Sequence, residues 1–270
     1  MTRVQLVEQI ENKQSYLCVG LDTDPARIPL HLQNDPDAVF VFNKAIIDAT
    51  KDHCIAYKIN TAFYEALGLK GWESLEKTAQ YIPSTHFKIA DAKGGDIGNT
   101  SAQYAQAFFE WLDFDAITVT PYMGEDSVRP FLEYKNKWTI VLGLTSNPGA
   151  KDFELLKTGE ALLYEKVITI SSQWGTTENL MFVIGATQAD QFANIRRLVP
   201  RHFFLVPGVG VQGGSLKEIS EKAMTKDCGI LVNVSRAIIY ASENENFAEE
   251  ASAIAQQYHH EMKKYLSKKF

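Results

Sequence analysis

Eight short apolar runs recur along the chain, and stretches whose apolar positions have helical spacing lie between them. The runs are "YLCVGLD" (16–22), "CIAYKIN" (54–60), "HFKIAD" (86–91), "DAITVT" (115–120), "WTIVLGL" (138–144), "LMFVIGA" (180–186), "HFFLVPG" (202–208) and "CGILVNV" (228–234). Strands that are apolar throughout are typical of a parallel sheet buried on both faces, and their alternation with helices is the βα pattern. Eight such units predict an α/β chain folded as a single-domain (β/α)8 TIM barrel over residues 1–270; the alternative is an open doubly wound sheet.

The longest connection between two runs spans residues 145–179. It begins "TSNPGAKDFELLKTGE", which predicts a mobile loop, and continues into the helical segment "ALLYEKVITISSQ" (161–173). Helical spacing also marks the amino-terminal "MTRVQLVEQIENKQ" and the carboxy-terminal "NFAEEASAIAQQYHHEMKKYLSKKF". We expect the carboxy-terminal helix to pack on the outside of the barrel.

Composition narrows the classes of partner. The chain has 270 residues, of which 45% are hydrophobic, and a formal net charge of −6, so it has no overall attraction to nucleic acid or to an anionic membrane. An anionic ligand must therefore be held by a local basic site. No apolar run is long enough to span a bilayer, and Cys18, Cys54 and Cys228 lie far apart, as expected of buried thiols in a reducing compartment. We expect a cytoplasmic protein that binds neither nucleic acid nor membrane.

Polar side chains occur where the predicted strands end, which is where the active sites of (β/α)8 barrels lie. In chain order these residues are Asp22, Lys58, Asn60, Asp91, Lys93, Asp96, Thr145, Ser146, Ser235 and Arg236. Because the carboxyl ends of the strands surround one opening, we expect these side chains to share a cavity.

A glycine-rich turn, "PGVGVQGG" (207–214), follows the seventh strand and leads into a helical segment. Its free backbone N–H groups, with the forked cation of Arg236 after the next strand, favour a phosphate-binding site that includes Gln212 and Gly213. The alternative is an ordinary turn without a ligand. The turn is not a P-loop, because no Gly-Lys-Ser/Thr follows, and it comes too late in the chain for a dinucleotide fingerprint.

The segment "DAKGGD" (91–96) places Lys93 between two aspartates, and Lys58 comes from the neighbouring strand. One interpretation is a structural ion-pair network. Buried ion pairs rarely gain net stability over apolar packing, which favours the other interpretation, an electrostatic site organised in advance for a reaction. A metal site would need a further carboxylate or histidine, but the histidines lie away from the strand ends and Lys58 stands where a metal ligand would be useful.

Several of these motifs occur together in a known family. "LCVGLD", "YKIN", "DAKGGDIGNT", "TSNPGA", "PGVGVQGG" and "NVSRAI" follow one another along the chain, and as a set they resemble the orotidine 5′-phosphate decarboxylases, above all their longer bacterial branch. The resemblance implies a (β/α)8 lyase, free of metal and cofactor, that converts orotidine 5′-phosphate (OMP) to UMP and CO2 in de novo pyrimidine biosynthesis. It also implies a homodimer with active sites at the subunit interface.

The resemblance assigns catalytic roles to four charged residues. Lys58 looks like the strand-two lysine beside the substrate, and Asp91 like the aspartate that faces the substrate carboxylate. Lys93 matches the lysine that delivers a proton to C6, and Asp96 resembles an aspartate contributed across the dimer interface. Carboxylates on both sides of Lys93 would keep it an ammonium, which can offset a developing carbanion and then protonate it.

The resemblance also assigns binding roles. Asp22 looks like the family's ribose-binding aspartate, and Thr100 like the residue that reaches the partner's ribose. Ser146 matches the serine that contacts the pyrimidine, with Thr145 beside it. Gln212 and Arg236 match the residues that hold the phosphate.

Two other functions share this scaffold. Sugar-phosphate decarboxylases and aldol-type synthases of the same superfamily carry the Asp-x-Lys-x-x-Asp pattern and use Mg²⁺, but their second strand ends in an acidic metal ligand where this chain has Lys58. A catalytically silent binder of phosphate ligands would be expected to have lost part of the charged array, and this chain retains it. Both features favour the decarboxylase.

Overall fold

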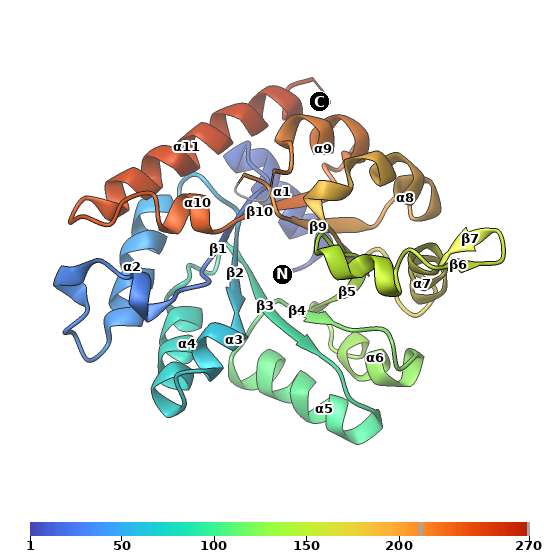
Figure 1. Cartoon of the computed structure of the whole chain (residues 1–270), viewed down its shortest axis with the longest axis horizontal. Helices are drawn as coiled ribbons and strands as arrows, with labels where there is room; N and C mark the ends of the chain where they lie inside the picture. The colour runs from blue at the N-terminus through green and yellow to red at the C-terminus, as the bar shows by residue number, and fades with distance from the viewer. Residues whose placement is uncertain (211–212, 269–270) are drawn as a thin grey trace.

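Eight parallel strands close into a barrel at the centre of the molecule, and helices surround it (Figure 1). The computed structural model describes residues 1–210 and 213–268. Around the barrel the order is β1, β10, β9, β8, β5, β4, β3 and β2, so consecutive barrel strands pair and the last closes on the first. The bounds are β1 (Leu17–Gly20), β2 (Ala56–Asn60), β3 (Phe87–Gly94), β4 (Ala116–Val119), β5 (Trp138–Leu144), β8 (Leu180–Ile184), β9 (Phe203–Pro207) and β10 (Ile230–Val234). One strand coincides with each predicted run, and the predicted (β/α)8 barrel is confirmed.

Aromatic side chains fill the amino-terminal end of the barrel. Phe87, Trp138 and Phe203 begin alternate strands, and the Trp138 ring packs edge-on against Phe87 and Phe203 at centroid separations of 6.2 and 6.3 Å. Since these contacts skip an intervening strand, the rings point into the barrel, in the layered packing of this fold. Met1 covers the same end: its amino group bonds Asp115 at 2.5 Å, and its carbonyl accepts from Trp138 Nε1 at 2.8 Å.

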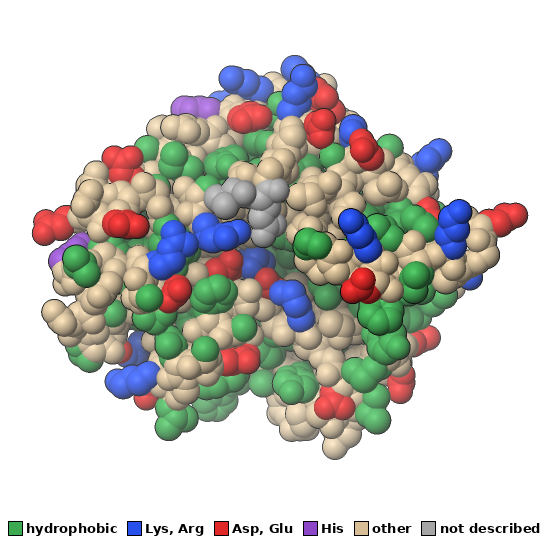
Figure 2. All heavy atoms as spheres, viewed as in Figure 1, with side chains coloured by type: hydrophobic (Ala, Val, Ile, Leu, Met, Phe, Trp, Pro, Cys, Tyr) green, Lys and Arg blue, Asp and Glu red, His purple; other side chains and the backbone are tan. Residues whose placement is uncertain are grey.

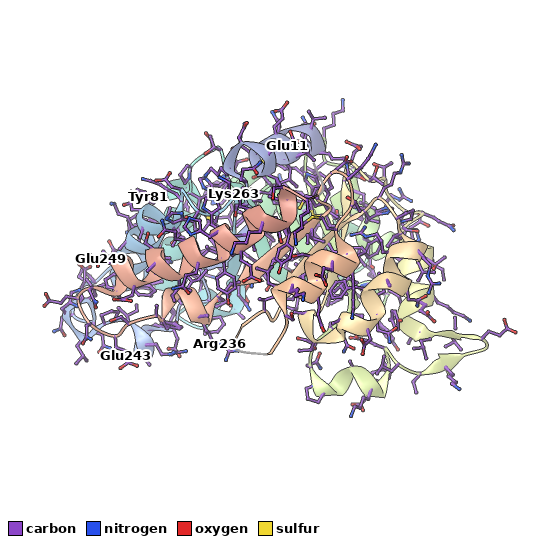
Figure 3. All side chains as sticks on the ribbon, turned by 90° about the horizontal axis from the view of Figure 1, so that it is seen from above. Glu11, Tyr81, Arg236, Glu243, Glu249 and Lys263 are labelled. Atoms are coloured by element: carbon purple, nitrogen blue, oxygen red, sulfur yellow. The ribbon has the colours of Figure 1, made fainter. Side chains whose placement is uncertain are left out.

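The helices lie outside the strands. Figure 3 shows α1, marked by Glu11, on the side of the barrel away from Arg236, so α1 covers the amino-terminal end and leaves the other end open. The helices are α1 (Arg3–Lys13), α2 (Ala38–Thr50), α3 (Thr61–Glu65), α4 (Leu69–Tyr81), α5 (Gly98–Gln106), α6 (Glu125–Leu132), α7 (Leu163–Ser171), α8 (Phe192–Leu198), α9 (Leu216–Ala223), α10 (Arg236–Ile239) and α11 (Phe247–Leu266). Shorter helical turns are η1 (Pro25–Arg27), η2 (Leu30–Leu32), η3 (Ala107–Trp111), η4 (Pro148–Asp152) and η5 (Ala186–Gln191).

The predicted carboxy-terminal helix is α11, and it packs outside the barrel against α2 and β1. Its buried residues form one stripe along the helix: Phe247, Ala251, Ala255, Met262 and Leu266. The Phe247 ring stacks on Phe42 of α2 with centroids 5.1 Å apart. Burying a side chain of this size stabilises the fold by about 1.5–3 kcal/mol, so the stripe holds α11 in place.

The long connection after β5 contains more regular secondary structure than its sequence indicates. It contains η4 and then a small antiparallel hairpin of β6 (Lys157–Thr158) and β7 (Ala161–Leu162) before α7. The predicted helix was therefore placed two residues too early, because Ala161 and Leu162 pair with β6. Strands of two residues are too short to show a period, and the mobility of this segment stays a prediction.

Two expectations from composition concern the protein interior and the membrane. Cys18, Cys54 and Cys228 are buried, as predicted, and form no disulfide among the described residues. Over residues 1–210 and 213–268, no helix has the length and apolar character needed to cross a membrane.

Candidate functional site

A cavity of about 570 Å³ opens at the carboxyl ends of the strands. Figure 2 shows basic and acidic side chains around a hollow near the centre of this face. Most of the residues predicted at the strand ends line the cavity together: Asp22, Lys58, Asn60, Asp91, Lys93, Thr145, Ser146, Ser235 and Arg236. The closure of the barrel brings them together from β1, β2, β3, β5 and β10.

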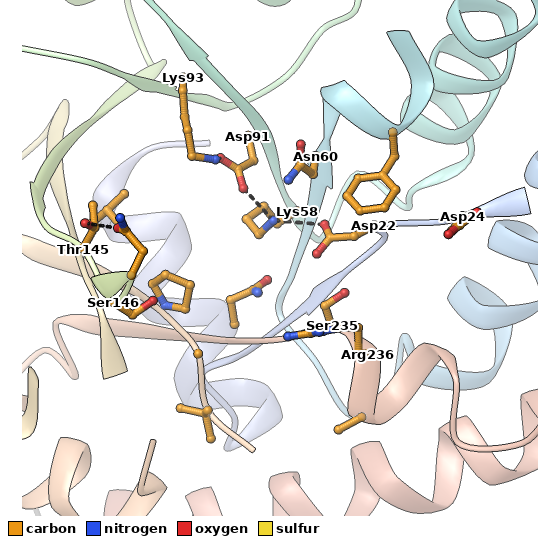
Figure 4. A pocket seen from close by; sticks show the side chains of 18 of the residues that line it. Asp22, Asp24, Lys58, Asn60, Asp91, Lys93, Thr145, Ser146, Ser235 and Arg236 are labelled. Atoms are coloured by element: carbon orange, nitrogen blue, oxygen red, sulfur yellow. Dashed lines mark hydrogen bonds and ion pairs between the residues drawn. The ribbon is translucent and has the colours of Figure 1, made fainter. Parts of the chain in front are cut away.

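Lys58 forms the centre of the charged group. Its side chain is 4% exposed, and Nζ donates to Asp91 Oδ2 at 2.8 Å and to Asp22 Oδ1 at 3.2 Å (Figure 4). Burial alone would lower the pKa of this ammonium, but the charges of Asp22 and Asp91 outweigh burial and raise the pKa above its ordinary value. Lys58 therefore stays protonated, and it occupies one oxygen of each carboxylate.

A bulge in β3 places Asp91 and Lys93 side by side. Ala90 pairs with Ile117 of β4 and Gly94 pairs with Val119, so residues 91–93 lie opposite one residue of β4. Lys93 has a φ of 48°, in the left-handed region, which a non-glycine residue adopts only when its surroundings impose it. The bulge turns Lys93 so that Nζ donates to Asp91 Oδ1 at 2.6 Å, with the side chain 48% exposed.

Thr118 secures this bulge. Its hydroxyl accepts from the Lys93 backbone N–H at 2.9 Å and donates to Asp91 Oδ1 at 3.1 Å. Burial by itself would raise the pKa of the Asp91 carboxyl, but Lys58 and Lys93 hold that pKa well below its usual range. Asp91 is thus a permanent carboxylate that bonds two ammonium groups.

Polar groups without a charge lie elsewhere on the cavity wall. Figure 4 shows Thr145 and Ser146 apart from the row formed by Asp22, Lys58 and Asp91. Asn60 caps α3, accepting from Ala62 N at 3.3 Å. These groups can recognise a polar ring or sugar beside the ion pairs.

Arg236 begins α10, and its exposed side chain has no hydrogen bond or ion pair with any described residue. Gly208 of the glycine-rich turn also lines the cavity, at a φ of 99° that favours glycine. Gly213 has a φ of 87° and donates its N–H to Gly210 O at 2.8 Å, but it is not among the described residues that line the cavity. Gln212 lies outside the described residues. The described cation and turn suit an anionic group.

Several lining residues were not predicted from the sequence: Asp24, Arg27, Phe63, Asn233 and Tyr240. Two of them carried a usable signal. Asn233 is a polar residue inside an apolar strand, and its buried Oδ1 lacks a partner among the described residues, as does Ser235 Oγ. Tyr240 follows Arg236 by four positions, which places both on one face of a helical turn.

Comparison with known families gives one match that covers most of the sequence. The sequence profile described as "Orotidine 5'-phosphate decarboxylase / HUMPS family" matches residues 15–251. The chain belongs to this family.

Two relatives and one solved structure match this chain over nearly their full lengths. Two relatives named orotidine 5′-phosphate decarboxylase are 58% identical (Christiangramia forsetii; 99% of this chain, 100% of the relative) and 56% identical (Phocaeicola vulgatus; 98% and 99%). The structure of Leishmania donovani OMP decarboxylase is 34% identical and superposes with a TM-score of 0.81, covering 96% of this chain and 99% of that one.

Besides Gly213, two predicted residues lie outside the cavity that their own chain forms. Asp96 follows β3, and its carboxylate accepts from Ile97 N at 2.7 Å, while Thr100 is exposed in the first turn of α5. Neither is among the described residues that line the cavity. Within one chain the second carboxylate of the array is therefore Asp22, and a role for Asp96 and Thr100 in a partner's site stays a prediction.

Proposed function

We propose that this family member is a carboxy-lyase that converts OMP to UMP and CO2 in pyrimidine biosynthesis. One observation carries the proposal: Asp91 holds the Lys93 ammonium at 2.6 Å in a cavity that also contains a buried lysine and an arginine whose side chain has no partner among the described residues. The first two relatives at 58% and 56% identity bear the name of this activity. A cytoplasmic location suits this role and the buried thiols.

In the proposed reaction the bond between C6 and the carboxylate breaks. CO2 leaves, and the electron pair of that bond stays on C6 as a vinyl carbanion that the pyrimidine ring cannot delocalise. Lys93 offsets this charge and transfers one Nζ proton to C6, which gives UMP and a neutral amine that regains a proton from water. Only interactions that strengthen as the charge develops accelerate the step, and a nearby ammonium is such an interaction.

Asp91 and Lys58 set the electrostatics of this step. The substrate carboxylate would approach the permanent carboxylate of Asp91, whose repulsion is relieved when CO2 leaves. Lys58 keeps Asp91 in place by its 2.8 Å bond and compensates part of the charge. The two lysines and Asp91 thereby form an array whose side chains need little reorganisation during the reaction.

The rest of the cavity would bind the nucleotide. Arg236, with Gln212 and Gly213 of the glycine-rich turn, would hold the phosphate, whose binding energy orients a ring several bonds away. The ribose and the pyrimidine would contact the remaining polar residues: Asp22, Asn60, Thr145, Ser146 and Ser235.

A homodimer would complete each site. Asp96 and Thr100 lie on the surface near the mouth of their own barrel end, at the end of β3 and the start of α5. A partner that covered this surface could receive both side chains in its cavity, where Asp96 would be a second carboxylate for Lys93. The dimer is thus proposed together with the activity.

The geometry disfavours the Mg²⁺-dependent reactions of the same family. A divalent cation in this cavity would need carboxylate oxygens at the ends of the first three strands, including an acidic ligand on the second strand. Lys58 stands at that position and bonds Asp22 and Asp91, so its ammonium competes for the same oxygens. This arrangement favours catalysis by side chains alone.

Incubation of the purified protein with OMP tests the proposal, with nucleotide products separated by chromatography and CO2 collected. One UMP and one CO2 should form for each OMP consumed. Recovery of unchanged OMP from folded protein would refute the activity, and a slow release of orotate would indicate a different reaction.

A further inference from the structure

The turn formed by Thr145 and Ser146, which follows β5 and lines the cavity, is held from outside by residues that do not line it. We propose that Glu154 is a positioning residue whose carboxylate fixes this turn so that it reads the pyrimidine ring. The inference rests on the proposed function, because it assigns Thr145 and Ser146 to the ring.

Glu154 grips Thr145 at two points. Its Oε2 accepts from the Thr145 backbone N–H at 2.7 Å, and its Oε1 lies 2.7 Å from Thr145 Oγ1. Thr145 Oγ1 also lies 2.6 Å from Asn147 Oδ1, and its single proton is donated to one of these two oxygens at a time, so the hydroxyl links the turn either to itself or to the residue nine positions later. A carboxylate that accepts from a backbone N–H forms one of the stronger hydrogen bonds in proteins. The additional contact with the hydroxyl fixes the orientation of Thr145 relative to Glu154 as well as the distance between them.

The backbone of Glu154 is anchored in turn. Its carbonyl accepts from Tyr164 N at 2.9 Å, and the next residue, Leu155, donates to Ala150 O at 3.2 Å and packs against the core. Tyr164 lies in the first turn of α7 and is 1% exposed. Hydrogen bonds therefore connect Glu154 to α7 through its backbone and to Thr145 through its carboxylate. A displacement of this carboxylate would move the turn formed by Thr145 and Ser146.

The other side of the turn is fixed by the segment that follows β8, which contains Gly185 and η5. Gln188 Nε2 donates to Thr145 O at 3.1 Å. At Gly185 an added Cβ would lie 2.7 Å from Ser146 N and 2.9 Å from Ser146 Cα, so only glycine allows the turn to approach β8 this closely. Packing fixes the turn on the β8 side, and the Glu154 carboxylate fixes it on the other.

The test separates ring recognition from general stability. Glu154→Ala removes both bonds to Thr145. Glu154→Gln keeps an acceptor for the Thr145 N–H, and its amide can donate to Thr145 Oγ1 while that hydroxyl donates to Asn147 Oδ1. Asp152→Asn is the matched control, because it removes an exposed carboxylate two residues away in the same segment. The readouts are kcat/KM for OMP and the inhibition constants of UMP and of ribose 5-phosphate, which lacks the ring.

We expect Glu154→Ala to lower kcat/KM for OMP by roughly 10–100-fold, because misplacement of a substrate-positioning group by about 1 Å has a cost of this order. The inhibition constant of UMP should rise by about tenfold, and that of ribose 5-phosphate should not change. Glu154→Gln should restore both values to within about threefold of wild type, and Asp152→Asn should match wild type. If Glu154→Ala does not fold, Glu154→Asp, which withdraws the carboxylate by one methylene, should show the same split more weakly.

If Glu154→Ala weakened the binding of UMP and of ribose 5-phosphate equally, the inference would be overturned, because Glu154 would then stabilise the whole carboxyl end of the barrel and not the ring-binding turn alone. If the wild type were active and the kinetic constants of Glu154→Ala were unchanged, the inference would be overturned and the proposed function would stand. A wild-type protein without turnover would overturn the proposed function and the inference with it.

Discussion

Lys58 carries a positive charge at a position that is almost closed to water. Placing an ion there costs several kcal/mol, and a pair of carboxylates at 2.8 and 3.2 Å offsets that cost. The pKa of Asp91 is lowered, so its stabilising contribution persists above the ordinary carboxyl range and is lost only below it. The pKa of Lys58 is raised, so its contribution is lost only above the ordinary lysine range. The pair stays charged across neutral pH.

In the proposed mechanism, the chemistry depends most on Lys93. Lys93→Ala should lower kcat by at least about 10³-fold, because it removes both the proton donor and the charge opposite the carbanion. The affinity for UMP should stay within about threefold of wild type, since UMP carries no carbanion. Steady-state kinetics and titration with UMP measure the two quantities.

A matched control comes from the same strand. Lys88 of β3 pairs with the exposed Asp113, away from the cavity, and Lys88→Ala should retain kcat. A Lys93→Ala protein as active as Lys88→Ala would remove Lys93 from the mechanism.

The cavity residues at the ends of strands could be predicted from the sequence, because a parallel barrel places the carboxyl ends of all its strands around one opening. Asp22, Lys58 and Arg236 were found in this way. Arg27 and Phe63 could not be found, since they come from η1 and α3, and the path of these segments depends on packing with no period in the sequence.

Among the elements, the strands were the most predictable and the bulge in β3 the least. A strand buried on both faces has an apolar run as its direct signature. The bulge depends on Thr118 of the next strand, whose hydroxyl bonds both Lys93 N and Asp91, and no local pattern records such a partner. The same limit applies to the hairpin of β6 and β7, whose pairing is only two residues long.

The contact between α1 and the start of β3 gives the fold a pH dependence. His86 precedes β3, and its Nε2 lies 2.8 Å from Lys13 Nζ of α1. Burial, and then the charge of Lys13, lower the pKa of His86 from 6.5 to about 4. The stability that the neutral His86 contributes is complete above pH 6.5 and is lost as the pH falls toward 4, because the unfolded chain takes up a proton that the folded chain excludes.

Replacement of this histidine should reduce the loss of stability in acid. Between pH 7 and pH 5 the free energy of unfolding of the wild type should fall by roughly 2 kcal/mol more than that of His86→Gln, which keeps a polar group but does not titrate. Urea unfolding at the two pH values measures both falls. His202 also has a pKa lowered to about 4, but it is present in both proteins, so its contribution to the fall cancels in the difference between them. Equal falls would show that His86 does not sense the pH.

At the scale of the whole molecule, charge is distributed by location. The net charge of −6 would repel an anionic nucleotide, yet Lys58, Lys93, Arg27 and Arg236 all line one cavity. A local basic site in an acidic protein favours a small anion over a polyanion. Composition predicted this class of partner, but only the closed barrel shows where the cations meet.

The proposed dimer makes a prediction that no single chain can fulfil. Lys93→Ala and Asp96→Ala should each be inactive alone, but a mixture that exchanges subunits should recover about a quarter of wild-type activity, because about half of the dimers are mixed and each has one intact site. The measurement is turnover after subunit exchange, with hybrid formation followed by a tag on one variant. Hybrids that form but show no activity would mean that each site is built within one chain.

The most direct test of the central claim is the loss of the orotate ultraviolet absorbance when the EDTA-treated protein meets OMP. We predict rapid loss with UMP as the product, because in the proposed mechanism Lys58, Asp91 and Lys93 provide the electrostatics and the proton without a metal. Loss of absorbance only after Mg²⁺ is restored would contradict this account, and so would a folded protein that leaves the absorbance unchanged under both conditions.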